Sequence, residues 1–379
     1  MKRSTERILT THTGSLPRPA QLTELLLKVD RGELADGDAG LRAQVADAVA
    51  DLVRRQAEVG VAVVNDGEAG KVGYSTYVKE RLTGFGGEDV GFTSFPQDFA
   101  DFPDYHAKLM SGVTLRLPAC IEPVAYRGRD AVRADIENLR AALDGCAVDD
   151  AFLSAASPGV IAVFLANRHY STDEEYLFAL ADAMKEEYDE IHRAGIVLQI
   201  DCPDLAMARH MLGDETLAEF RARIETHVEA INHATRDIPP EEMRLHLCWG
   251  NYAGPHRHDV PLADVVDIVL RARPVGISFE GANPRHEHEW RVFEEVALPD
   301  EKFLIPGVLD STTNYVEHPR LVADRIVRYA ALVGRERVMA GTDCGFATFA
   351  DLLPVDPAIA WAKLEAMAQG AALASRELW

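Results

Sequence analysis

The chain has 379 residues, of which 47% are apolar, and its 39 basic and 61 acidic residues give a formal net charge of −22. Such an acidic surface repels phosphate backbones and anionic membranes, so nucleic acid is not expected as a partner. The sequence has no apolar stretch long enough to predict a membrane span, and its N-terminal segment lacks the apolar core of a signal peptide. Five widely spread cysteines indicate free thiols in a reducing cytoplasm rather than a disulfide framework.

Short apolar runs that predict β-strands alternate with helical patterns along most of the chain. The clearest helix covers 172–194, where Thr172 and Glu175 predict a capping box and Gly195 predicts the stop. Strands are expected at 8–11, 61–65, 151–155, 196–200, 243–247, 275–279, 303–306 and 337–340. Further helices are expected at 41–58, 129–143, 215–235, 262–271, 319–333 and 357–374.

This repeated order of strand and helix predicts parallel strands with crossover helices, in a (β/α)8 TIM barrel that forms one domain over 1–379. A doubly wound open sheet is the alternative, and the lack of a Gly-rich dinucleotide fingerprint after the first strand disfavours it. The segment 84–123 is rich in Gly, Phe, Asp and Pro, and we expect a long insertion that covers one end of the barrel. A further strand at 115–121 would lie either outside the barrel or inside it, in place of one of the eight.

Polar residues follow several of the predicted strands. In a barrel of this kind the active groups lie at the C-terminal ends of the strands, so this pattern predicts a shared pocket at one rim. The polar residues that follow predicted strands are 12–15, 66–68, 201–202, 246–248, Glu280, Asp310 and 343–344.

The most informative of these ends is His246-x-Cys248. Alternate residues of a strand point to the same side, so this imidazole and this thiol would project together. Glu280 and Cys344 follow later strands at separations that match whole βα units, and nitrogen, oxygen and sulfur are all accepted zinc donors. These four residues form a candidate zinc site. A packed histidine beside a buried thiol is the alternative for the pair alone.

Two other histidine pairs compete with this site. They are His256-x-His258 and His286-x-His288, and both lie in charged loop sequence. We interpret both pairs as solvated loop residues rather than metal ligands.

Six motifs together resemble the C-terminal catalytic barrel of cobalamin-independent methionine synthase, whose superfamily includes uroporphyrinogen decarboxylases and zinc thiol alkyltransferases. The resemblance extends from about residue 10 to residue 345, and the chain is similar to the short single-barrel relatives, including epoxyalkane:coenzyme M transferase-like proteins. The motifs are THTGSLPRP (11–19), DGEAG (66–70), QIDCPDLA (199–206), HLCWGNY (246–252), SFEGAN (278–283) and GTDCG (341–345).

The resemblance implies that His246, Cys248, Glu280 and Cys344 bind Zn²⁺, and that zinc binds the thiol of a small acceptor such as homocysteine. A free thiol is mostly protonated near neutral pH, and zinc holds the sulfur as the nucleophilic thiolate. The implied activity is a zinc-dependent alkyltransferase, in the first place a methyltransferase of methionine biosynthesis with a methyl-folate as one possible donor.

The same resemblance assigns the amino-acid part of the acceptor to Gly14, Ser15, Glu68 and Asp201. Gly14 and Ser15 would offer donors to its carboxylate, and Glu68 and Asp201 would bind its ammonium group. Both carboxylates directly follow apolar runs, where burial without a partner is costly. Glu68 and Asp201 are therefore also the expected catalytic residues.

The sequence departs from the family at several positions. Thr312 stands where methionine synthases carry the histidine that delivers a proton to the departing folate, while the nearby His318 is expected to open a helix. Cys202 replaces a common glutamate, and His12 and Trp249 would reshape the pocket. The residues that would bind zinc and activate the thiol are all present, while the identities of the alkyl donor and of the acceptor thiol are not determined.

Two other activities remain alternatives. An epoxide-opening transferase that uses coenzyme M needs cations for a sulfonate, and Arg18, Lys71 and Arg285 are candidates that each also read as surface charges. A metal-free lyase like uroporphyrinogen decarboxylase would bind no zinc. A non-catalytic protein would keep a closed, four-ligand structural zinc site.

Overall fold

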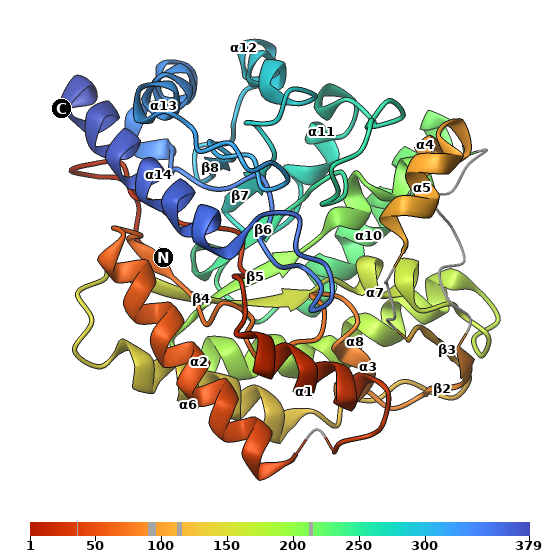
Figure 1. Cartoon of the computed structure of the whole chain (residues 1–379). Coiled ribbons are helices and arrows are strands. Elements are labelled where there is room, and N and C mark those ends of the chain that lie inside the picture. The colour runs from red at the N-terminus through yellow and green to blue at the C-terminus, as the bar shows by residue number, and fades with distance from the viewer. Residues whose placement is uncertain (36, 90–95, 112–115, 212–214) are drawn as a thin grey trace.

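The computed structural model describes residues 1–379 except 36, 90–95, 112–115 and 212–214. Its centre is a curled sheet of parallel strands in the order β1-β4-β5-β6-β7-β8, with helices on the outside (Figure 1). Strand order follows chain order, as expected when each strand is joined to the next by an outer crossover. The strands are β1 Val63–Val64, β4 Asp150–Ala156, β5 Val197–Asp201, β6 Met243–His246, β7 Gly276–Phe279 and β8 Phe303–Pro306.

Two further segments close the sheet into a barrel. Thr10 and Ala340 form a parallel bridge to each other, and Val338 bridges to Leu304 of β8. The carbonyl oxygen of Thr10 also accepts hydrogen bonds from the backbone N–H groups of Ala62 and Val63, at 3.0 and 2.9 Å. The segments predicted as strands at 8–11 and 337–340 therefore complete the (β/α)8 TIM barrel through single bridges. The predicted fold class is confirmed, whereas these two segments are shorter than the strands expected there.

The long outer helices, apart from α1, which was not predicted, agree closely with the periodic apolar patterns. In α8, Thr172 Oγ1 accepts from the N–H of Glu175 at 3.1 Å. The Glu175 carboxylate accepts from Ser171 rather than from Thr172, so only half of the predicted capping box forms. Gly195 follows with a φ of 70°, a conformation that favours glycine. The long helices are α1 Ala20–Asp30, α2 Ala39–Glu58, α6 Arg129–Leu143, α8 Asp173–Arg193, α10 Leu217–Ala234, α13 Pro319–Val333 and α14 Pro357–Leu378.

The helix predicted at 262–271 is wrong as one element. It divides into the 3₁₀ turn η3 Leu262–Asp264 and the short helix α11 Val266–Val269. Val265 between them has a φ of −129°, outside the helical range, and its buried β-branched side chain packs in the core. The other short helices lie in the connections and are α3 Val78–Arg81, α7 Pro158–Phe164, α9 Ala208–Met211 and α12 Val292–Glu295.

The insertion at 84–123 lies over the carboxyl end of the strands. Its strands β2 Phe85–Asp89 and β3 Pro118–Cys120 pair antiparallel outside the barrel. The further strand predicted at 115–121 therefore lies outside the barrel, and residue 115 is not among the described residues. Its helices α4 Gln97–Asp101 and α5 Pro103–Leu109 lie near the loop that follows β6 (Figure 1). Tyr105 Oη donates to Ala253 O at 2.7 Å, and a His258–Asp101 ion pair of 2.8 Å adds to this contact.

Among the helices in the described ranges, each is too short or too polar to cross a membrane.

Candidate active site

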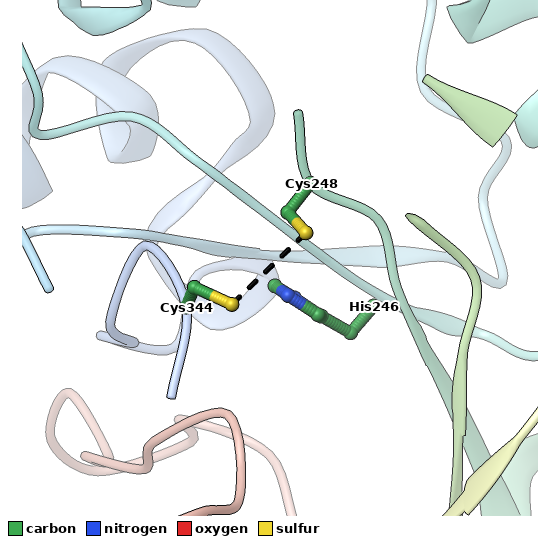
Figure 2. A group of neighbouring side chains, drawn as sticks. All are labelled: His246, Cys248 and Cys344. Carbon is green, nitrogen blue, oxygen red and sulfur yellow. Dashed lines mark hydrogen bonds between the residues drawn. The ribbon is translucent and has the colours of Figure 1, made fainter. Parts of the chain in front are cut away.

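Three predicted metal ligands meet at the carboxyl rim of the barrel. His246 is the last residue of β6, Cys248 follows two positions later, and Cys344 follows the segment that bridges β8. Their ligand atoms all lie within 4.8 Å of one another, and all three side chains are buried (Figure 2). The alternation expected from a strand therefore brings the imidazole and the first thiol together, and the barrel closure adds the second thiol.

The donor set fits a zinc ion. His246 Nδ1 lies 3.2 Å from Ser278 Oγ, while its Nε2 is buried and has no hydrogen-bond partner among the described residues. Burial lowers the pKa of His246 to about 4, so the imidazole is neutral, as a metal ligand must be. Cys344 Sγ and Cys248 Sγ lie 4.0 Å apart; their hydrogen bond lowers the pKa of Cys248 and raises that of Cys344. One imidazole nitrogen and two thiols are typical zinc ligands.

Glu280, the fourth predicted ligand, does not belong to this group of three. Its Oε1 accepts from the backbone N–H of Trp249 at 2.9 Å, and its Oε2 accepts from Asn283 Nδ2 at 2.6 Å. Burial, followed by the nearby Cys248, raises the pKa of Glu280 to about 7. Both carboxylate oxygens of Glu280 are therefore engaged by other protein groups.

Asp343 organises the loop that carries Glu280. It accepts from the backbone N–H groups of Gly281, Ala282 and Asn283, each at 2.8 Å. Asp343 directly precedes Cys344, so one turn supplies both a candidate ligand and the support of the neighbouring loop.

The two predicted substrate carboxylates face each other beside the thiols. Glu68 has a φ of 53°, and its Oε2 is buried without a hydrogen-bond partner among the described residues. Asp201 ends β5 and accepts from Gln199 Nε2 at 2.7 Å. Burial, followed by repulsion from Glu68, raises the pKa of Asp201 to about 7. A buried acidic pair of this kind is suited to bind a cationic group.

Gly14 and Ser15 lie against this pair. A Cβ on Gly14 would lie 2.6 Å from Glu68 Oε1, so only glycine allows the carboxylate to approach here. Ser15 Oγ accepts from the N–H of Ala347 at 3.3 Å, which ties it to the turn after Cys344. Ser15 is one of the residues that line the cleft. Gly14 is not, and it affects the site only through the room that it leaves for Glu68.

The three metal-ligand candidates, Ser15 and the two carboxylates Glu68 and Asp201 all line one cleft. Its outer wall is apolar, and the insertion contributes Phe99, Leu109 and Met110 to it. Opposite the insertion, the aromatic rings of Tyr74 and Phe349 pack with their centroids 5.5 Å apart. The insertion therefore covers the site, as predicted, and makes the outer part of the cleft hydrophobic.

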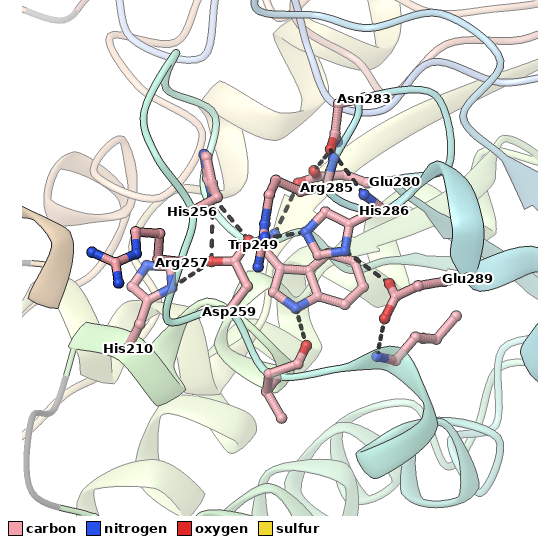
Figure 3. A network of polar contacts seen from close by, with 12 residues as sticks. His210, Trp249, His256, Arg257, Asp259, Glu280, Asn283, Arg285, His286 and Glu289 are labelled. Atoms are coloured by element: carbon pink, nitrogen blue, oxygen red, sulfur yellow. Dashed lines mark hydrogen bonds and ion pairs between the residues drawn. The ribbon is translucent and has the colours of Figure 1, made fainter.

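A buried acidic centre beside the site was missed by the sequence reasoning. Asp259 contacts three imidazoles: His210 Nδ1 at 3.0 Å, His256 Nδ1 at 2.9 Å and His286 Nε2 at 2.9 Å (Figure 3). The ring of His286 also stacks on Trp249, with their centroids 4.0 Å apart. The expectation of solvated loops is wrong for His256 and His286, because Asp259 pairs with them inside the protein.

The second histidine of each predicted pair is more exposed than the first. His258 is partly exposed and pairs with Asp101, and His288 is exposed. Solvated loop positions were therefore predicted correctly only for the outer member of each pair.

Several other residues singled out in the sequence lie away from the cleft lining. His12 Nε2 bonds to Gln56 Oε1 at 2.8 Å, and Trp249 Nε1 donates to Val260 O at 2.6 Å. Cys202 is buried, and burial raises its thiol pKa. None of His12, Trp249 and Cys202 is among the described residues that line the cleft.

The candidate cations also have other roles. Arg18 and Lys71 are buried, not surface charges: Arg18 Nη2 donates to Glu68 O at 2.9 Å, and Lys71 Nζ donates to Ser154 O at 2.5 Å. Arg285 is exposed. The burial of Arg18 and Lys71 was not visible in the sequence, because both side chains donate to backbone carbonyl groups.

The fold and the site define a TIM-barrel enzyme with its active groups on the carboxyl rim. The family model described as "Cobalamin-independent synthase, Catalytic domain" matches residues 160–371. The chain belongs to this family, and it is an enzyme of the cobalamin-independent methionine synthase type.

Relatives match nearly the whole chain. A methionine synthase of Thermococcus kodakarensis is 26% identical over 96% of this chain and 93% of its own length. A 2-hydroxypropyl-CoM lyase of Xanthobacter autotrophicus is 23% identical over 98% and 96%. The solved structure of a B12-independent methionine synthase from Shewanella sp. W3-18-1 in complex with selenomethionine has a TM-score of 0.73, with 20% identity over 98% and 99% of the two chains. This structural likeness concerns the fold.

Proposed function

We propose that the chain, as one catalytic barrel over residues 1–379, is a zinc-dependent thiol alkyltransferase. Its acceptor is a small amino-acid thiol such as homocysteine, and a methyl group is the first candidate for the transferred carbon. The observation that carries this proposal is the cluster of His246, Cys248 and Cys344 in the lining of a cleft, with a buried imidazole nitrogen that has no hydrogen-bond partner in the described part of the chain. The methionine synthase relatives support the same class of reaction.

His246, Cys248 and Cys344 would hold the zinc ion, with Glu280 as the predicted fourth ligand. When bound, zinc keeps the acceptor sulfur in its nucleophilic thiolate form near neutral pH. Glu280 is not part of the close group of three donors, and it accepts hydrogen bonds from Trp249 and Asn283. Three close donors, with Glu280 bound to other protein groups, leave a position for the acceptor thiol, which is typical of catalytic rather than closed structural zinc sites.

Glu68 and Asp201 would bind and orient the ammonium group of the acceptor. Oε2 of Glu68 has no hydrogen-bond partner among the described residues, and the pKa of Asp201 is raised by burial and by Glu68. A positive charge between the two carboxylates relieves their repulsion and fixes the acceptor relative to the thiols. The sulfur then forms a bond to the donor carbon, and the bond between that carbon and its leaving atom breaks with its electron pair on the leaving atom.

The metal assignment is tested by zinc analysis and by thiol titration of cobalt-substituted protein. We expect about one zinc per chain, and a change in the cobalt spectrum when homocysteine is added. Cys344→Ser should lose most of the metal, whereas the matched control Cys120→Ser, a buried cysteine of β3, should keep it. Unchanged metal content in Cys344→Ser would refute the assigned ligand set.

The substrate assignment is tested with Asp201→Asn and Glu68→Gln. Each should weaken homocysteine binding by roughly tenfold or more, since a charge-assisted contact contributes about 1.5–3 kcal/mol, while zinc content stays the same. Loss of zinc in either variant would mean that the carboxylate supports the metal instead.

The cleft composition disfavours the coenzyme M alternative. Among the described residues that line the cleft none is Lys or Arg, and the stretches outside the description contain neither residue type. The charged lining residues Glu68, Asp201 and Asp351 are all acidic. A sulfonate, or the carboxylates of a decarboxylase substrate, would therefore meet negative charge, which supports an ammonium-bearing acceptor and an uncharged or weakly charged donor.

A further inference from the structure

A buried histidine in the cleft wall has no role in the proposed metal or acceptor sites. His210 lies in α9, and it lines the cavity together with Met207 and Met211. Its Nδ1 lies 3.0 Å from Asp259, and its Nε2 is buried without a hydrogen-bond partner in the described part of the chain. A histidine that bonds a carboxylate through one nitrogen and lines a cleft with the other nitrogen unpaired is arranged to transfer a proton.

Asp259 is suited to orient this ring. Burial alone would raise its pKa, but hydrogen bonds from His210, His256 and His286 hold the pKa well below the usual range. Asp259 is therefore a carboxylate that accepts the Nδ1–H of His210 and leaves Nε2 as the exchanging nitrogen. Because His286 is itself held by Glu289 at 2.8 Å, the carboxylate is fixed from more than one side (Figure 3).

The backbone connects His210 to the metal ligands. The N–H of His210 donates to Met207 O at 3.3 Å, and the N–H of Met207 donates to Cys248 O at 3.2 Å. The turn that carries the histidine is thus bound directly to the backbone of a thiol ligand. His210 and the two thiols line the same cleft, which is where a donor molecule would bind.

Alkylation of a thiolate needs an acid when the leaving atom is a basic nitrogen or oxygen. That atom departs with the electron pair of the broken bond, and protonation makes it a better leaving group. The resemblance implies that methionine synthases use a histidine for this step, at the position of Thr312 in this sequence. The N–H and the hydroxyl of Thr312 both donate to Asp310 at 2.8 Å, and threonine is no acid in this pH range.

We propose that His210, oriented by Asp259, is the general acid that protonates the leaving atom of the alkyl donor. The proton passes from Nε2 to the departing nitrogen or oxygen, and water restores it after release of the product. This inference rests on the proposed thiol alkyltransferase function, and it supplies the proton step that the substitution at position 312 removes.

The experiment compares two electrophiles on the zinc-loaded enzyme with homocysteine. Opening of 1,2-epoxypropane by the thiolate breaks a carbon–oxygen bond and requires a proton on that oxygen. Methyl iodide releases iodide, which requires none. Rates above the uncatalysed background are measured for wild type, H210Q and D259N, with H288Q, an exposed histidine, as the matched control.

We expect H210Q to lower the epoxide rate by roughly 100-fold or more, the usual contribution of a general acid, with the methyl iodide rate unchanged. D259N should show the same selectivity to a smaller extent, and H288Q should match wild type. Equal epoxide rates in wild type and H210Q would overturn the assignment, as would an equal loss with both electrophiles. If homocysteine fails to perturb the cobalt-substituted site, the proposed function fails instead, before either electrophile is added.

Discussion

The ion pair between His286 and Asp259 should make the stability of the protein depend on pH in the alkaline range. Burial alone would lower the pKa of His286, but hydrogen bonds to Asp259 and Glu289 outweigh burial and raise the pKa to about 10. The ordinary value is 6.5. Because each pH unit corresponds to about 1.4 kcal/mol, the folded protein gains about 5 kcal/mol from this proton below pH ~6.5.

The sign follows from where the proton is bound. Above about pH 6.5 the unfolded chain has lost the proton of this histidine, while the folded chain keeps it until about pH 10. The stabilisation from His286 is therefore fully present below the unfolded pKa and is lost as pH rises through the folded pKa. The free energy of unfolding should fall by up to about 1.4 kcal/mol per pH unit in this range.

The assay is urea denaturation at several pH values between 6.5 and 10, with saturating zinc and constant salt. Wild type is compared with His286→Gln and with His288→Gln, an exposed control two residues away. The difference between wild type and His286→Gln should shrink steadily with pH, while His288→Gln should follow wild type. Titrating groups that do not interact with His286 occur in both proteins and cancel in this difference, whereas Glu280, whose pKa is lowered by the charged His286, does not. A difference that stays constant from pH 6.5 to 10 would refute the assignment of a charged, buried His286.

Three further changes test the local geometry. Ser278→Ala removes the hydrogen bond that orients His246, so zinc affinity measured against a chromophoric chelator should fall by roughly 10–100-fold; unchanged affinity would contradict this role. Thr172→Ala removes an N-cap and should lower the free energy of unfolding in urea by about 1 kcal/mol, with cobalt-site spectra unchanged. Gly14→Ala brings a methyl group onto Glu68, so homocysteine affinity in the cobalt titration should fall by roughly tenfold with full metal content; loss of metal would indicate a wider disturbance.

The barrel could be predicted from the sequence because its strands are buried on both faces. Runs such as 151–155 and 303–306 are nearly continuous in apolar residues, as parallel strands require, and each forms a strand. The two segments that close the barrel, around Thr10 and Ala340, were predicted less accurately, because single bridges rather than full ladders connect them to their neighbours. Packing also overrides helical periodicity where the β-branched Val265 divides the helix expected at 262–271.

The candidate site was predictable to the extent that strand geometry determines it. The two-residue period of β6 places His246 and Cys248 on one side, and the chain order of strands places Cys344 near them. The Asp259 network was not predictable in this way, because it joins loops whose meeting depends on tertiary contacts. Histidines in charged loops are usually solvated, and only the position of Asp259 between three of them reverses that interpretation here.

Charge explains why the metal and the acceptor sites lie side by side. Glu68 and Asp201 interact in a buried setting, where burial first and then repulsion from Glu68 raise the pKa of Asp201. A simple thiol would use the thiol-binding side of the cleft and leave this repulsion in place. An amino-acid thiol brings an ammonium group to the carboxylates and a sulfur to the metal ligands, so it compensates both at once. Selectivity for such an acceptor would then come from relief of repulsion, which is stronger in the low-dielectric floor of the cleft than in water.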